Sequence, residues 1–188
     1  MYYYKRIHLG HLDPILAVTL RSQNSQEIIS LFLQLFGIFE QTFFTTTSLR
    51  LWIKYPRSEA DSDGMEVFLP LINSFPSFDN LSTLYLSSDF HSFLLPLLQR
   101  ISSSGSVLLP SLRIVRFINA DFRPSSESLA PVSAFLQWRR ERGFPIHKIN
   151  IIECCIDQEY VQLRLRDVEV DMEDCWSYYD SDPDTEYY

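Results

Sequence analysis

The chain has few glycines and no long apolar run, and both absences narrow the kinds of protein it can be. Only 5 of its 188 residues are glycine, so a glycine-rich loop that cradles phosphates is not expected. The motifs G-x-S-x-G and H-E-x-x-H are absent too. No uncharged stretch approaches the ~18 apolar residues that a membrane helix needs. We therefore expect neither an enzyme nor a membrane protein, and assign no catalytic, cofactor-binding or metal-binding residues.

Cysteine is scarce as well. The three cysteines are Cys154, Cys155 and Cys175, and an odd number with two of them adjacent does not suit a disulfide framework. Such a set is typical of a reducing compartment. We expect an intracellular protein, in the cytoplasm or the nucleus.

Positive charge is missing from the C-terminal end. The segment 167–188 holds nine acidic residues and no lysine or arginine, whereas the rest of the chain has 15 acids against 16 bases. A nucleic-acid-binding protein needs a basic surface that displaces phosphate counterions, so nucleic acid is not an expected partner. Residues 171–188 are predicted to be an acidic, disordered tail.

A short apolar pattern, L-x-x-L-x-L or a close relative, recurs along the chain. Its central positions are 31, 35, 31, 34 and 19 residues apart, and recurrence at 20 to 50 residues is typical of stacked repeats. The six copies are Ile15–Leu20, Thr46–Leu51, Leu81–Leu86, Leu112–Phe117, Ile146–Ile151 and Leu165–Val170.

Segments with the apolar spacing of helices alternate with these strand-like copies. The clearest lie at 28–39, 90–101 and 129–138. Parallel strands joined by helical crossovers are the expected result. The strands alternate between apolar and polar residues, so one face is expected to be buried and the other open. Residues 1–170 are therefore predicted to form an α/β domain, a short irregular leucine-rich-repeat-like solenoid with strands on one face and helices on the other. A doubly wound sheet is the alternative.

Two runs in the C-terminal half carry a family resemblance. They are LPSLRIVRFINADFRP, residues 109–124, and FLQWRRERGFPIHKINIIECC, residues 135–155. They resemble the C-terminal leucine-rich-repeat-like region of F-box proteins from mushroom-forming fungi (basidiomycetes). In that family a helix ending in Arg-x-x-x-Gly, here Arg139 to Gly143, leads to a basic-flanked strand and a Glu-Cys turn, here Glu153-Cys154. A Val-x-Val strand, here Val168-Glu-Val170, and an acidic end follow. The likeness covers roughly residues 45–174.

This resemblance implies a protein-binding domain that recruits substrates to an SCF-type ubiquitin ligase. The F-box itself, which begins with a Leu-Pro-x-Glu-like motif in that family, is not evident within residues 1–50. Docking to the ligase adaptor is thus expected only if an F-box lies upstream. Two other interpretations stay open: a truncated repeat fragment without adaptor function, and an enzyme on a doubly wound α/β sheet.

Residues between the apolar strand positions are the candidates for contact with a partner protein, because they would point outward from the sheet. Aromatic and arginine side chains are frequent in binding hot spots. The chain is expected to act as a monomer without a cofactor. The assigned partner-binding residues are Trp52, Tyr85, Arg116 and Asn150, with Arg50 and Glu169 as further outward positions.

Two other groups have mainly structural interpretations. Cys154 occupies the inward Asn or Cys position of the leucine-rich repeat, where a small buried thiol is expected to be inert. Arg139, Arg140 and Arg142 are predicted to lie on the solvated side of their helix, where they complement the helix dipole. Docking of an acidic partner is the alternative for these arginines.

Overall fold

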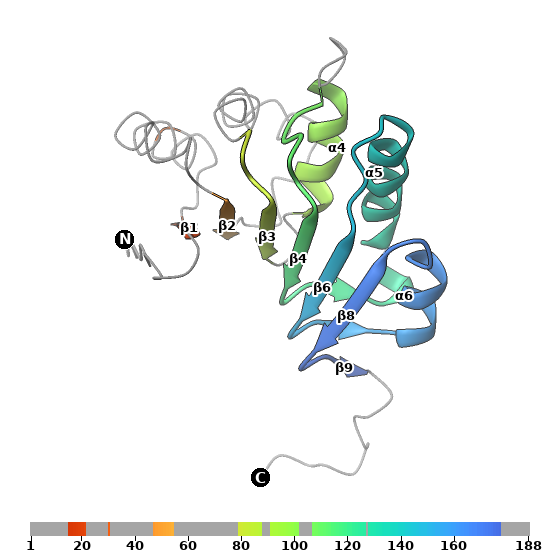
Figure 1. Ribbon diagram of the computed structural model, residues 1–188. Coiled ribbons are helices and arrows are strands. Elements are labelled where there is room, and N and C mark those ends of the chain that lie inside the picture. The colour runs from red at the N-terminus through yellow and green to blue at the C-terminus, as the bar shows by residue number, and fades with distance from the viewer. Residues whose placement is uncertain are drawn as a thin grey trace, which may run out of the picture.

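The computed structural model describes residues 15–21, 30, 47–54, 79–87, 91–101, 107–126 and 128–177. Together they show a mixed α/β architecture in which all strand pairs are parallel (Figure 1). The predicted helix at 28–39 lies outside this part of the chain, except for the helical residue Ser30.

The larger sheet has its strands in chain order, and each strand pairs with the one that follows it in this sheet. Its strands are β1 (Ile15–Arg21), β2 (Ser48–Lys54), β3 (Thr83–Ser87), β4 (Ile114–Ile118), β6 (Lys148–Ile152) and β8 (Glu169–Glu173). A smaller sheet consists of β5 (Asp121–Phe122), β7 (Cys155–Ile156) and β9 (Trp176–Ser177), also in chain order. The parallel strands predicted from the sequence are thus confirmed.

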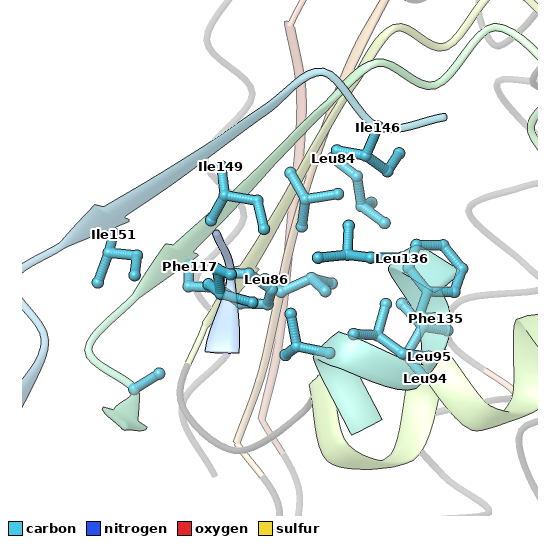
Figure 2. Packing of buried hydrophobic residues seen from close by; sticks show 14 of the residues in the cluster. Leu84, Leu86, Leu94, Leu95, Phe117, Phe135, Leu136, Ile146, Ile149 and Ile151 are labelled. Carbon is cyan, nitrogen blue, oxygen red and sulfur yellow. The ribbon is translucent and has the colours of Figure 1, made fainter. Parts of the chain in front are cut away.

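Helices cover one face of the larger sheet. They are α4 (His91–Ile101), α5 (Leu129–Glu141) and α6 (Gln158–Arg164); α4 packs against α5, and α5 against α6. Figure 2 shows the resulting core, in which strand residues such as Leu84, Phe117 and Ile149 face Leu95 of α4 and Phe135 of α5. These side chains are fully or almost fully buried, and burial of each stabilises the fold by about 1.5–3 kcal/mol.

The predicted helix at 129–138 is confirmed as α5, and its end follows the expected glycine rule. Gly143 has φ +79°, a left-handed conformation that most side chains disfavour. The N–H of Gly143 donates to the carbonyl of Arg140 at 3.0 Å, and the N–H of Phe144 donates to that of Arg139 at 3.0 Å. These bonds satisfy carbonyls that the last turn leaves without helical partners.

The strand register aligns four copies of the apolar pattern and corrects the first and the last. Leu49, Leu84, Val115 and Ile149 are in register across β2, β3, β4 and β6. In β1, however, Leu16 rather than Val18 pairs with Leu49. In β8, Val170 rather than Val168 pairs with Ile149, and Met172 pairs with Ile151. Both errors are slips of two residues, which keep the same side chains on the same face because strand side chains alternate with period two.

The last repeat also contains a helix that the apolar pattern did not indicate. Helix α6 is short, and its N-cap residue is Asp157. The Asp157 carboxylate Oδ1 accepts a hydrogen bond from the N–H of Tyr160 at 3.0 Å. Leu165, taken in the sequence as the start of a strand copy, is instead the buried C-cap residue of this helix. The ordered sheets extend to Ser177, so residues 171–177 belong to β8, β9 and their connection rather than to a tail. Residues 178–188 lie outside the described part.

A turn of the same geometry joins each of the last three long strands to the smaller sheet. Asn119, Glu153 and Asp174 have φ between 51° and 55°, in the left-handed region. Each directly precedes a small residue: Ala120, Cys154 or Cys175. Asparagine and aspartate tolerate this conformation better than most residues, whereas Glu153 is held there by neighbouring backbone bonds such as its N–H to the carbonyl of Glu173 at 3.0 Å.

Arg139 is buried, contrary to the prediction that it lies on a solvated helix face. Only 1% of its surface is exposed. Its guanidinium donates to the carbonyl oxygens of Phe144 at 2.9 Å, Leu108 at 3.1 Å, Leu109 at 3.1 Å and Leu112 at 3.3 Å. Burial, and then the positive charge of Arg113, lower the pKa of Arg139 to about 10. The side chain therefore ties the C-terminal end of α5 to the loop before β4.

Candidate partner-binding surface

The strand register aligns five polar residues on the face of the larger sheet opposite the helices. Successive partners across β2, β3, β4, β6 and β8 are Arg50, Tyr85, Arg116, Asn150 and Asp171. We call this set the outward row. Its members alternate with core residues such as Leu84, Leu86, Val115 and Phe117, so their side chains leave the sheet on the other face. Asp171 is exposed and the other four are half-buried.

Three of the four predicted contact residues thus stand side by side. Tyr85, Arg116 and Asn150 are neighbours on adjacent strands, as expected, and Arg50 joins them. Trp52 lies in β2, where its backbone pairs with Thr19, but its side chain is outside the described residues. Glu169 is exposed, but its strand partner is Lys148, and this pair lies two residues before the pair of Asn150 and Asp171. The outward row therefore continues to Asp171 rather than to Glu169.

Arg50, Tyr85 and Arg116 form an arginine–tyrosine cluster at one end of the outward row. The guanidinium carbon of Arg50 lies 5.3 Å from the centroid of the Tyr85 ring, and that of Arg116 lies 5.0 Å from it. A guanidinium within about 6 Å of an aromatic centroid is attracted to the ring by roughly 0.5–1 kcal/mol at sites that water reaches. Tyr85 therefore orients both arginines, which come from the strands on either side of β3.

Several polar atoms of the outward row lack hydrogen-bond partners. Nε of Arg50, Nε of Arg116 and Oδ1 of Asn150 are each shielded from solvent and unbonded. Most buried polar atoms in proteins are bonded, and an unbonded one costs about 1–3 kcal/mol. These three shielded atoms lie along one row, where hydrogen bonds only partly offset the desolvation of the polar groups.

The other end of the outward row is charge-balanced and then acidic. The ammonium group of Lys148 lies 2.7 Å from Oε1 of Glu169 and 2.5 Å from Oδ2 of Asp171. Hydrogen bonds to Asp171 and Glu169 raise the pKa of Lys148. With Glu173, these two acids give β8 three exposed carboxylates. Since β8 ends the described order of the larger sheet, such charges oppose pairing with another strand.

The thiols in the repeat turns act as internal hydrogen-bonding groups. Sγ of Cys154 accepts from the N–H of Ala120 at 3.2 Å and faces the carbonyl of Ile152 at 3.2 Å. Burial raises the pKa of the Cys154 thiol to about 12, so the nucleophilic thiolate is scarce at neutral pH. Cys175 has an equivalent place one repeat later, with Sγ 3.2 Å from the carbonyl of Ile151. The sequence analysis identified only Cys154 at this position; the 21-residue spacing to Cys175 was the available signal.

A hollow on the helix side was also missed. It has a volume of about 530 Å³ and lies between α5 and residues 163–168. Leu163, 68% exposed, stands at its rim, and Arg140 bonds across it to Asp167 at 3.0 Å. Its sequence signal was weak because α6, which supplies Leu163, was not predicted.

Within the described residues, no group of three or more His, Cys, Asp or Glu side chains could hold a metal ion. None of the described helices is long and apolar enough to cross a membrane. Comparison with models of protein families, with curated proteins and with solved structures found no match.

Proposed function

We propose that the chain is a protein-binding module whose outward row contacts a partner protein. The observation that carries this proposal is the alignment of Arg50, Tyr85, Arg116 and Asn150 across four adjacent strands. Arginine and tyrosine are enriched in interface hot spots, and here they come from rigid strands rather than loops.

We further propose that the domain is a short, irregular leucine-rich-repeat-like solenoid. Three features support it: the strands follow chain order, the helices share one face, and a left-handed turn with a small inward residue recurs. A doubly wound sheet reverses its strand order at a switch point, where its ligands bind, whereas the described strands run in sequence. The likeness of residues 45–174 to fungal F-box proteins suggests substrate recruitment to a ubiquitin ligase as the biological use.

Affinity capture tests the binding function. The tagged chain, a row variant (Tyr85→Ala with Arg116→Glu) and a control variant (Arg166→Glu) are incubated with an extract of the native cells. Arg166 is a suitable control because its side chain is 77% exposed and lies outside the outward row. A specific partner should be recovered by the wild type and the control but not by the row variant, and the purified pair should reconstitute binding. Equal recovery by all three proteins, or none by any, would refute the proposal.

The narrower statement about the ligase has its own test. The chain, extended by the natural coding sequence upstream of Met1, should recover the ligase adaptor together with substrates. Failure to recover the adaptor would reject the F-box assignment while leaving the protein-binding function to the first experiment.

A further inference from the structure

We propose that the arginine–tyrosine cluster of Arg50, Tyr85 and Arg116 is a binding site for carboxylate side chains of an acidic peptide segment. This inference rests on the proposed protein-binding function and specifies the chemistry of the partner. It is carried by charge and by the rigid placement of the two guanidinium groups.

Among the described residues, no carboxylate neutralises the two arginines of the cluster. Elsewhere, Arg123 pairs with Asp121 at 2.6 Å and Arg140 with Asp167 at 3.0 Å. By contrast, no carboxylate of the described residues forms an ion pair with Arg50 or Arg116. Half-buried charges without partners are costly. A carboxylate from outside would remove both this cost and the mutual repulsion of two guanidinium groups around one ring.

The geometry suits a carboxylate. Nε of each arginine is shielded, so the two Nη groups form the fork that remains, and a planar fork matches the two oxygens of a carboxylate. Since neighbouring strands lie about 4.8 Å apart, the backbones of β2 and β4 are roughly 10 Å apart. A peptide that crosses the strands could therefore present one acid to each arginine. The Tyr85 ring holds both cations in place beforehand, which lowers the entropy cost of binding.

The same face disfavours long polyanions. Glu169, Asp171 and Glu173 stand at its β8 end, and among the described residues Lys148 forms ion pairs with the first two. A nucleic acid running along the outward row would meet these carboxylates, whereas a short peptide with its acids at the β2–β4 end would not. Asn150 lies between the two ends and carries no charge. The charge pattern thus favours a peptide that is locally acidic.

Fluorescence anisotropy with a labelled peptide of alternating Glu and Ala tests the proposal, and the matched Gln/Ala peptide is the negative probe. The wild type should bind only the Glu peptide, and added inorganic phosphate should compete if any oxyanion suffices. Arg50→Gln and Arg116→Gln should each weaken binding about tenfold or more, since each removes a charge-assisted pair. Arg116→Lys keeps the charge but loses the fork, so it should fall between wild type and Arg116→Gln. Arg166→Gln removes the same charge elsewhere and should bind like the wild type.

Circular dichroism and thermal unfolding identify any variant that fails to fold. If either Arg50→Gln or Arg116→Gln does not fold, the other variant still tests the site. Equal affinity for the Glu and Gln peptides, or affinity unaffected by both substitutions, would overturn the inference. If partner capture depends on the outward row but the Glu peptide does not bind, the carboxylate site is wrong and the binding function stands. If the Glu peptide binds at the arginines but no partner is captured, the site stands and the proposed function fails.

Discussion

Replacing Arg139 with methionine removes the buried guanidinium that joins the α5 segment to the loop before β4, while keeping an unbranched apolar stem. The matched control is Arg140→Met, one residue along the same helix. Arg140 is exposed, and its side chain makes a surface ion pair with Asp167 at 3.0 Å. Both variants lose one positive charge from α5, so a difference between them reports the buried hydrogen bonds rather than the helix dipole.

The expected magnitude follows from the four carbonyl groups that Arg139 contacts at 2.9 to 3.3 Å. Each hydrogen bond from a charged donor contributes about 1.5–3 kcal/mol, and a buried acceptor left unbonded costs about 1–3 kcal/mol. Burial opposes this gain: lowering the pKa from 12.5 to about 10 corresponds to roughly 3 kcal/mol against the charged form. We expect Arg139→Met to lower the free energy of unfolding by about 3–5 kcal/mol, because the lost hydrogen bonds and the carbonyls left unbonded outweigh the burial cost that is relieved. Arg140→Met should cost under about 1 kcal/mol.

Urea unfolding followed by circular dichroism measures both values. With a slope of about 2 kcal/mol per molar urea for a domain of this size, Arg139→Met should shift the midpoint downward by roughly 1.5–2.5 M, and Arg140→Met by less than about 0.5 M. Equal midpoints for the two variants would refute the conclusion that Arg139 is a buried structural arginine.

Three further predictions each concern one residue. The Cys154 thiol, with its pKa raised from 9.0 to about 12, stays protonated in the fold while it ionises in the unfolded chain. The free energy of unfolding should therefore fall between pH 9 and 12, less steeply in Cys154→Ala, and an equal slope in both would contradict this. Gly143→Ala should lower the free energy of unfolding by about 1 kcal/mol. The cost comes from the φ of +79° alone, since an added Cβ meets nothing within 4 Å. Gly143→Asn should lower the stability less, as measured by thermal unfolding, and a larger loss for Asn than for Ala would contradict the backbone explanation. Asp157→Ala should cost about 1 kcal/mol through loss of the cap on the Tyr160 N–H, whereas Asp157→Asn should retain most of the stability; equal losses would exclude capping as the cause.

Some errors of the sequence analysis share one physical origin, the period of a strand. Leu16, Val18 and Leu20 alternate along β1, and Val168, Val170 and Met172 do so near β8. A slip of two residues keeps every apolar side chain on the same face, so the pattern cannot distinguish the two alignments. Pairing with the neighbouring strand selects one of them.

The burial of Arg139 has a different origin. Its spacing from Val132, Phe135 and Leu136 already put it on the buried stripe of α5, but its charge argued for solvent. Backbone carbonyls of residues 108–112 and 144 offset the desolvation of the guanidinium by accepting its hydrogen bonds. Their proximity depends on a loop that begins about 30 residues earlier in the chain, so no local pattern could indicate it.

Some features of the candidate surface could be predicted from the sequence, and others depend on the tertiary structure. Alternation along each strand was enough to predict that Tyr85, Arg116 and Asn150 share a face opposite the core, because side-chain direction is a local property of the backbone. Tertiary structure decided which of them touch. Arg50 and Arg116 are 66 residues apart in the sequence, and only the packing of β2, β3 and β4 in one register brings both guanidinium groups to the Tyr85 ring. Register depends on the burial of whole strands against the helices, and this is a long-range property of the folded chain.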